Sequence, residues 1–371
     1  MNFEERIHQV ISREMENTES EAVRFLTKIQ AKPKLCLWGL GSHGRLWYAY
    51  LKKLNISIDY VFDNSSQALA QWCGEEKKLT RQEFEEHLPE MTVVVAMRNA
   101  QPSVDELRSL GFYDTYVTTL NIFCFDTSRR YSGHPAQLRE MEQHLYEVLA
   151  LCADDPSREI VCQTVEKWFD EANVNIDCIE DGYFVQPIIS LSEEEIFVDA
   201  GAYDGDTIAD FLRMTDGKYC HIYAFEMVEE TRAHLLCRVQ EDPRYDIKRT
   251  TVFPYGLLDK NVTLHYNGKG MAAVIDESGD GIAEFRSLDE VLEGKPVTFI
   301  KMDIEGAEPE ALRGAERTIR RCSPKLAICT YHKAEHLWEI PFYIRGINPE
   351  YKFYFRHHTM EESDTVCYAV L

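Results

Sequence analysis

Charged side chains gather in two short stretches near the C-terminal end of the chain. Lys301, Asp303 and Glu305 follow one apolar run, and His332 follows another, 326–330. In an open α/β sheet, ligands bind beyond the carboxyl ends of the strands, so these four residues are candidates for catalysis. An imidazole that is near neutral at physiological pH suits a general base, which makes His332 the first choice and Asp303 the second. Lys301 would orient an acceptor or compensate the two nearby acids.

The same residues allow plainer interpretations. Lys301, Asp303 and Glu305 alternate and could form a salt-bridge network at a sheet edge, and a lone histidine such as His332 is more often a structural hydrogen-bonding group. Asp303 and Glu305, with Asp199 or another acid, could also hold Mg²⁺. Because no group of His, Asp and Asn demands a metal, we predict none.

A glycine loop lies upstream, between an apolar strand and a helix. It contains Asp199, Gly201, Tyr203 and Gly205. An acidic side chain in such a loop suits a ligand that carries a cationic ammonium and sulfonium. The next strand ends on Glu226, which could accept hydrogen bonds from both hydroxyls of a ribose. The alternative for Glu226 is an acid that faces the N-terminus of the next helix.

Four motifs in one order resemble the FkbM family of S-adenosylmethionine-dependent methyltransferases. They occupy residues 197–202, 224–226, 287–289 and 299–308, within a resemblance that spans about 195–371. The resemblance implies a class I methyltransferase fold and O-methylation of sugars and other natural-product hydroxyls. It also implies S-adenosylmethionine as the cofactor, which would be bound by Asp199, Gly201, Tyr203, Gly205, Glu226 and Asp303.

A second glycine loop, near the N-terminus, has the spacing of a dinucleotide fingerprint. Gly39, Gly41 and Gly44 follow a strand and open a helix, and Asp63 ends the next strand. Such glycines let the backbone approach a pyrophosphate, and the acid takes a ribose hydroxyl. This is a candidate second nucleotide site, in a segment that resembles Rossmann-like modules attached to sugar-modifying transferases. The alternative is a Rossmann-like fold that keeps the turn but binds no ligand.

The periodicity of the chain predicts the elements that position these residues. Short apolar strands alternate with helices on both sides of a long helical stretch, which indicates an α/β fold with two Rossmann-like units, parallel sheets and a helical connector. Two β-rich runs at the end, 351–356 and 365–371, predict a terminal antiparallel hairpin. We expect four segments: a helical segment at 1–30, a nucleotide-binding-type domain at 31–130, the connector at 131–190 and the methyltransferase domain at 191–371.

Composition limits the partners of the protein. The 371 residues carry a formal charge of −23, which disfavours nucleic acids and anionic membranes. No apolar run has the length of a membrane span, and the charged N-terminus lacks a secretory signal. The 11 cysteines are scattered without a Cys-x-x-Cys motif, which is typical of reduced thiols in a cytoplasmic protein.

The leading interpretation is a cytoplasmic O-methyltransferase that acts on a hydroxyl of a sugar, a glycan precursor or a related natural product. The N-terminal unit would hold a nucleotide-linked acceptor. One alternative is an enzyme that uses NAD or a nucleotide sugar at the Gly39 loop, although that unit has no Tyr-x-x-x-Lys pair. The other is a non-catalytic binding module with a cofactor fold. The oligomeric state and the identity of the acceptor stay open.

Overall fold

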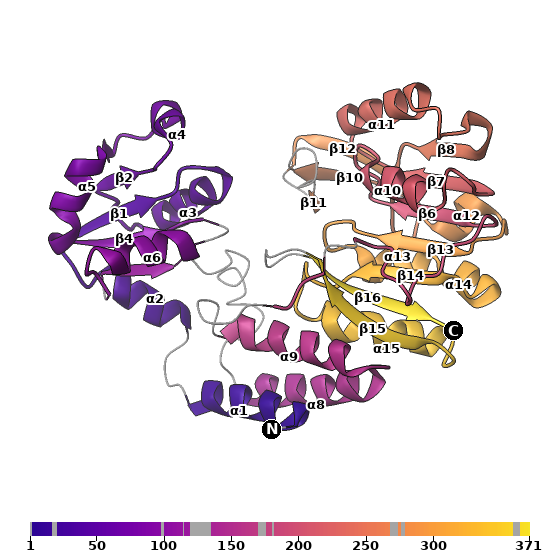
Figure 1. Cartoon of the computed structure of the whole chain (residues 1–371), viewed down its shortest axis with the longest axis horizontal. Coiled ribbons are helices and arrows are strands. Elements are labelled where there is room, and N and C mark those ends of the chain that lie inside the picture. The colour runs from indigo at the N-terminus through magenta and orange to yellow at the C-terminus, as the bar shows by residue number, and fades with distance from the viewer. Residues whose placement is uncertain are drawn as a thin grey trace. The chain divides into compact units, whose positions relative to one another are not determined.

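The structure, a computed structural model, divides into two compact units. The first contains residues 1–143 and 163–175, and the second contains 144–162 and 176–371. The described residues are 2–16, 21–97, 100–113, 115–118, 135–169, 176–179, 182–267, 274–275, 279–358 and 364–371. Each unit has its own parallel sheet, which confirms the predicted α/β class (Figure 1). Within the described residues, no helix combines the length and the apolar character needed to cross a bilayer.

The N-terminal unit is built on a five-stranded sheet in the order β3-β2-β1-β4-β5, with all neighbours parallel. Its strands are β1 Lys34–Trp38, β2 Tyr60–Phe62, β3 Lys77–Lys78, β4 Met91–Val95 and β5 Tyr116–Thr118. Its helices are α1 Phe3–Glu16, α2 Glu21–Ile29, α3 Ser42–Lys53, α4 Ser66–Gln71, α5 Arg81–His87 and α6 Gln101–Ser109, with a 3₁₀ turn at Leu88–Glu90.

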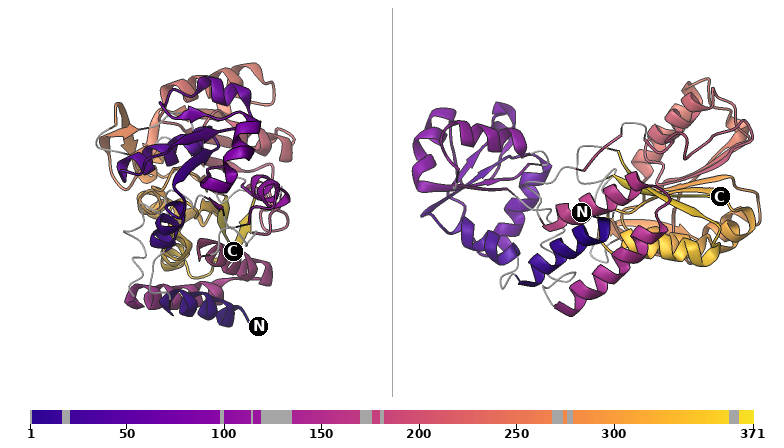
Figure 2. Two further views of the ribbon diagram at one scale, coloured as in Figure 1. Left: turned by 90° about the vertical axis from the view of Figure 1, so that its left-hand side faces the viewer. Right: turned by 60° about the horizontal axis from the view of Figure 1, so that its bottom comes forward.

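Both faces of this sheet are buried because side chains alternate along β1. Leu35 and Leu37 belong to one core cluster with Trp47 of α3, whereas Cys36 and Trp38 belong to another. The views in Figure 2 show helices on both sides of the strands.

The alternation of apolar and polar residues at 56–62 predicts a strand over that range, but β2 contains only Tyr60–Phe62. The Asp59 carboxylate accepts a hydrogen bond from Leu35 N at 3.0 Å and pairs with Lys34 Nζ at 2.8 Å, while the Asp59 backbone N donates to Leu35 O at 2.9 Å, so side chain and backbone together join Asp59 to β1 just before β2 begins.

The long helices predicted in the connector follow β5 and precede β6 along the chain; they are α8 Pro135–Leu151 and α9 Asp155–Phe169.

The C-terminal unit is built on a seven-stranded sheet in the order β15-β16-β14-β13-β6-β7-β8. Its strands are β6 Ile196–Ala200, β7 His221–Phe225, β8 Thr250–Phe253, β13 Phe299–Met302, β14 Lys325–Cys329, β15 Lys352–His357 and β16 Thr365–Val370. Its helices are α10 Asp206–Met214, α11 Glu229–Glu241, α12 Leu288–Leu292, α13 Glu308–Gly314, α14 Glu316–Cys322 and α15 His336–Ile347, with a 3₁₀ turn at Ile247–Arg249.

The centre of this sheet is held by stacked aromatic rings. Phe197 of β6 stacks on Phe299 of β13 and on Phe211 of α10, with ring centroids 5.2 and 4.8 Å apart. The strands β15 and β16 pair antiparallel, which confirms the predicted terminal hairpin. β14 and β16 also pair antiparallel. The strands β14, β13, β6, β7 and β8 are parallel to their neighbours in this series, so their carboxyl ends meet at one edge of the sheet.

A smaller sheet, in the order β11-β10-β12-β9, packs beside that edge. Its strands are β9 Tyr255–Leu257, β10 Val262–Asn267, β11 Val274–Ile275 and β12 Gly281–Arg286. Ala283 and Phe285 of its buried face share a core cluster with Met227, which follows β7, and Ala307, which follows β13. The sequence at 262–271 predicts a strand followed by a glycine-rich turn. The strand is β10, whereas residues 268–271 lie outside the described residues.

Candidate functional site

Asp199 and Lys301 form a buried pair in the centre of the large sheet. They face each other in the register of β6 and β13, and Lys301 Nζ lies 3.0 Å from Asp199 Oδ1. Asp199 is fully buried, and neither of its oxygens accepts a hydrogen bond within the described residues. Burial raises the pKa of Asp199 to about 6, although Lys301 opposes the shift. The carboxylate that was expected to face a cationic ligand therefore faces a lysine.

Lys301 also ties the glycine loop to the sheet. Its Nζ donates a hydrogen bond to Gly201 O at 2.8 Å. Burial lowers the pKa of Lys301, but the carboxylates of Asp199 and Asp303 outweigh burial and hold the pKa above its usual value. Lys301 was expected just after its strand; it lies within β13 and is 2% exposed, since the strand runs to Met302. Its geometry is that of a positioning residue.

The glycine loop after β6 has a left-handed backbone at three positions, Gly201, Tyr203 and Gly205 (φ +78°, +44° and +88°). A Cβ on Gly201 would lie 1.9 Å from the carbonyl oxygen of Asp303, so only glycine fits there. The Gly201 and Ala202 amides donate to Phe225 O at 3.1 and 3.0 Å. These bonds hold the loop against the end of β7.

Glu226 lies directly after β7 and faces this loop. Its two oxygens accept hydrogen bonds from Tyr203 N at 3.0 Å and from Val228 N at 2.7 Å. The residue is 8% exposed, and burial raises its pKa to about 7 even though both amides oppose that shift. Each carboxylate oxygen has two acceptor positions, so Glu226 keeps capacity for two further donors.

An acid and histidine cluster follows the ends of β13 and β14; we call it the Asp303 cluster. Its members are Asp303, Glu305, Glu308, His332 and His336. His332 Nε2 lies 3.5 Å from both Asp303 Oδ1 and Glu305 Oε2, and its Nδ1 lies 3.0 Å from Glu308 Oε1. His336 Nδ1 lies 3.4 Å from Glu308 Oε2. The structure therefore brings three of the four predicted catalytic residues, Asp303, Glu305 and His332, together at this edge of the sheet, whereas Lys301 lies behind them within β13.

Two tyrosines hold the carboxylate of Asp303. Tyr183 donates to Oδ2 and Tyr331 donates to Oδ1, both at 2.9 Å. Burial raises the pKa of Asp303, but Lys301, His332 and the two phenols outweigh burial and lower the pKa below its usual range. Asp303 is therefore a negatively charged carboxylate that is held by two hydrogen-bond donors and two nearby cations.

The electrostatics of His332 differ from the sequence-based expectation. A near-neutral imidazole was expected, but three carboxylates surround His332 in the structure. Burial lowers its pKa, whereas Glu308, Glu305 and Asp303 outweigh burial and raise the pKa to about 10. With such a pKa, and unless another cation binds beside these carboxylates, His332 carries a proton at neutral pH. It was chosen as the base because a neutral imidazole was expected, and that expectation does not hold in this arrangement.

Sequence reasoning missed three members of this site. Glu308 is the last residue of the motif at 299–308, so it could have been chosen as a candidate from its place in that motif. No sequence pattern pointed to Tyr183 or His336. Tyr183 lies in an irregular segment, and His336 lies at the start of α15.

In the N-terminal glycine loop, Gly44 packs tightly against the backbone of Gly39. A Cβ on Gly44 would lie 1.8 Å from Gly39 O, whereas nothing lies within 4 Å of the corresponding position on Gly41. Asp63 Oδ2 accepts from Leu40 N at 2.8 Å, so the predicted ribose acid is engaged by the loop itself. This carboxylate therefore has a structural partner whether or not a nucleotide binds.

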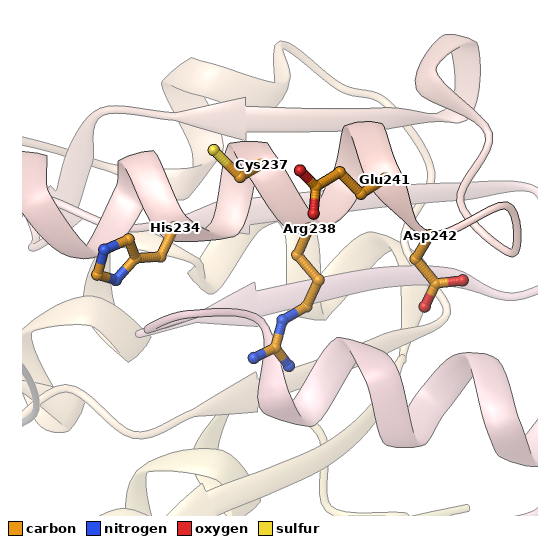
Figure 3. A pocket seen from close by; sticks show the side chains of 5 residues that line it. All are labelled: His234, Cys237, Arg238, Glu241 and Asp242. Carbon is orange, nitrogen blue, oxygen red and sulfur yellow. The ribbon is translucent and has the colours of Figure 1, made fainter.

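A surface pocket of about 420 Å³ lies along α11 (Figure 3). Its lining residues are His234, Cys237, Arg238, Glu241 and Asp242. It contains none of the residues at the carboxyl ends of β6, β7 and β13, so it does not mark the candidate site.

Two comparisons with known proteins find a likeness: a family model matches part of this chain, and a solved structure has a similar fold. Residues 199–355 match the family model of the methyltransferase FkbM domain. A crystal structure described as methyltransferase FkbM from Methylobacillus flagellatus KT is similar over 99% of this chain and 98% of its own, with a TM-score of 0.76 and 20% sequence identity. At this identity, the likeness shows a shared fold. A search of curated proteins finds no match.

Two other solved structures match about half of this chain. An rRNA methylase from Streptococcus thermophilus has 16% identity over 48% of this chain and 87% of its own, with a TM-score of 0.32. Fibrillarin of Aeropyrum pernix, in complex with natively bound S-adenosyl-L-methionine, has 14% identity over 49% of this chain and 70% of its own, with a TM-score of 0.31. At these scores, neither supports a conclusion about this chain.

Proposed function

Because residues 199–355 of this chain match the family model of the methyltransferase FkbM domain, we propose that the protein is an S-adenosylmethionine-dependent O-methyltransferase. Its acceptor would be a hydroxyl of a sugar, a glycan precursor or a related natural product. The observation that carries the proposal is the position of Glu226: a carboxylate at the end of β7 that faces the glycine loop of the neighbouring strand.

The residues of this edge fit the methyl donor. Glu226 has unused acceptor capacity for ribose hydroxyls, and the left-handed backbone at Gly201 and Gly205 turns the chain sharply between β6 and α10 beside Glu226. Lys301 and Asp199 act beneath the loop, where they fix its carbonyl rather than contact the ligand. When bound, S-adenosylmethionine supplies a methyl group activated by a sulfonium.

The Asp303 cluster would position the acceptor. In the reaction, the acceptor oxygen gains a bond to the methyl carbon, the carbon–sulfur bond breaks, and the hydroxyl proton leaves to a base. Asp303 and Glu305 are 25% and 33% exposed at their side chains, so they face the space that an acceptor would enter. Positioning would supply much of the acceleration, and proton removal the remainder.

A calorimetric titration with S-adenosylhomocysteine tests the donor site. We expect micromolar binding to the full chain, loss of binding in Glu226→Ala and unchanged binding in Glu229→Ala, an exposed acid three residues further on. Methyl transfer from labelled S-adenosylmethionine to sugars would then identify the acceptor, and an alkali-stable product would indicate an ether. Absence of binding to the folded wild-type protein would refute the proposal.

We also propose that the N-terminal loop holds the nucleotide part of a nucleotide-linked acceptor. The open space beside Gly41, at the N-terminus of α3, supports this proposal, because a phosphate could approach there even though Gly39 and Gly44 lie against each other. Titrations with a UDP-sugar and with NAD test it, and binding of NAD alone would instead favour the oxidoreductase alternative.

A further inference from the structure

The Asp303 cluster contains three side chains in the arrangement of a metal site. Asp303, Glu308 and His332 each offer a ligand atom, and these atoms all lie within 4.8 Å of one another. They come from the end of β13, the first turn of α13 and the end of β14, so three separate elements converge on one point. Such convergence of two carboxylates and an imidazole is the donor set of many divalent-cation sites.

Glu308 shows why this point needs positive charge. Its carboxylate is fully buried, at 0% exposure. Oε1 accepts hydrogen bonds from Ile304 N at 2.9 Å and Gly306 N at 3.4 Å, but Oε2 accepts none within the described residues. Its charged neighbours are two imidazoles, with His332 Nδ1 3.0 Å from Oε1 and His336 Nδ1 3.4 Å from Oε2. A buried carboxylate with an oxygen in this state is costly unless a cation compensates it.

The lysine of the site does not provide that compensation. Lys301 lies 3.0 Å from Asp199 and is held there by Gly201 O, so its charge is shared with another acid. Asp303, Glu305 and Glu308 together bring three negative charges around two imidazoles. A divalent cation would balance two of these charges and leave the imidazoles neutral, which is the form that ligates metals.

We infer that Asp303, Glu308 and His332 bind a first-row divalent cation of the Mn²⁺, Co²⁺ or Zn²⁺ class. The imidazole ligand favours these ions over Mg²⁺ and Ca²⁺, which prefer sites made of oxygen ligands alone. Glu305, 3.5 Å from His332 Nε2, lies beside the site and would orient the imidazole or a bound water.

The proposed cation site is open to solvent on the side of Asp303, where the cation could bind the acceptor hydroxyl. The Asp303 side chain is 25% exposed, whereas His332 and Glu308 lie beneath it. An open coordination position at this edge would take the acceptor hydroxyl and lower its pKa, as metal ions do for bound water. This use rests on the proposed methyl transfer, whereas the binding of the cation does not.

Metal content and Mn²⁺ binding test the inference without an activity assay. Samples of the full chain are treated with a chelator and dialysed separately against MnCl₂, CoCl₂ and ZnCl₂. Elemental analysis then measures each metal, and electron paramagnetic resonance measures bound Mn²⁺. We expect about one tightly held Mn²⁺ per chain, with an affinity at least about 100-fold lower in Glu308→Gln and His332→Ala, because each loses a direct ligand. Glu310→Gln, which removes a partly buried acid that pairs with Arg313 on the same helix, should bind like the wild type.

Two outcomes would overturn the site. One is wild-type protein that retains none of Mn²⁺, Co²⁺ and Zn²⁺; this result needs no variant and holds even if Glu308→Gln does not fold. The other is equal Mn²⁺ binding by the folded wild type and His332→Ala. Titration with S-adenosylhomocysteine runs in parallel: donor binding without metal binding refutes the cation site alone, and metal binding without donor binding refutes the proposed function alone.

Discussion

The pKa of Glu226 predicts how the affinity for the methyl donor changes with pH. A ribose hydroxyl donates a stronger hydrogen bond to a carboxylate than to a neutral carboxylic acid. Burial raises the pKa of Glu226 to about 7, so the carboxylate forms only as the pH passes through neutrality. Binding of the donor should therefore strengthen as the pH rises, and then level off above the pKa.

The size of this effect follows from the ionised fraction. With a pKa of about 7, Glu226 is about one-eleventh ionised at pH 6 and about ten-elevenths ionised at pH 8. If only the ionised form binds, the affinity rises about 10-fold between these values, which corresponds to about 1.4 kcal/mol. Glu226→Gln has no titrating group here and should show a weaker and flatter affinity.

Calorimetry with 5′-methylthioadenosine is the appropriate assay. This ligand keeps the ribose and the adenine but has no amino-acid part, so its own titration does not enter the comparison. Its affinity is measured at half-unit steps from pH 6 to pH 8.5 for the wild type and for Glu226→Gln. A pH-independent affinity in the wild type, or the same rise in Glu226→Gln, would refute the role of this carboxylate.

Two predictions concern the stability of the site. Lys301→Met should lower the free energy of unfolding by about 3–5 kcal/mol, because it leaves the Asp199 carboxylate buried without its cation. Adding Asp199→Asn to that variant should restore part of the loss in urea titrations, and a strictly additive loss would contradict the pairing. Gly201→Ala should cost about 3 kcal/mol or more, because its Cβ would meet the Asp303 carbonyl in a left-handed conformation. Gly41→Ala, with open space around it, should stay within about 0.5 kcal/mol of the wild type, and equal losses in both would show that the close approach is not the cause.

The strands and the glycine loop of the C-terminal unit were predictable because short, continuous stretches of sequence specify each of them. The run at 197–205 contains its own apolar strand, its acid and its turn glycines, so no distant residue is needed to recognise it. Glu226 was predictable for the same reason, since it directly ends a strand.

The partners within the site were not predictable in this way. Tyr183 reaches Asp303 across 120 residues, and no pattern in the sequence encodes that contact. The electrostatics of His332 depend on Glu305 and Glu308 closing around it after folding, so its ordinary pKa was a poor guide. Asp199 was recognised as part of the loop, but its orientation toward Lys301 is set by the pairing of β6 with β13.

The bond from Lys301 to Gly201 also bears on when the donor site forms during synthesis. It joins residues that are 100 positions apart in the chain. A nascent chain that has emerged only as far as β8 already contains the glycines and Glu226, but it lacks the ammonium group that fixes the loop. The donor site would therefore mature only when β13 inserts beside β6, and ligand capture by stalled chains of increasing length would begin at that strand.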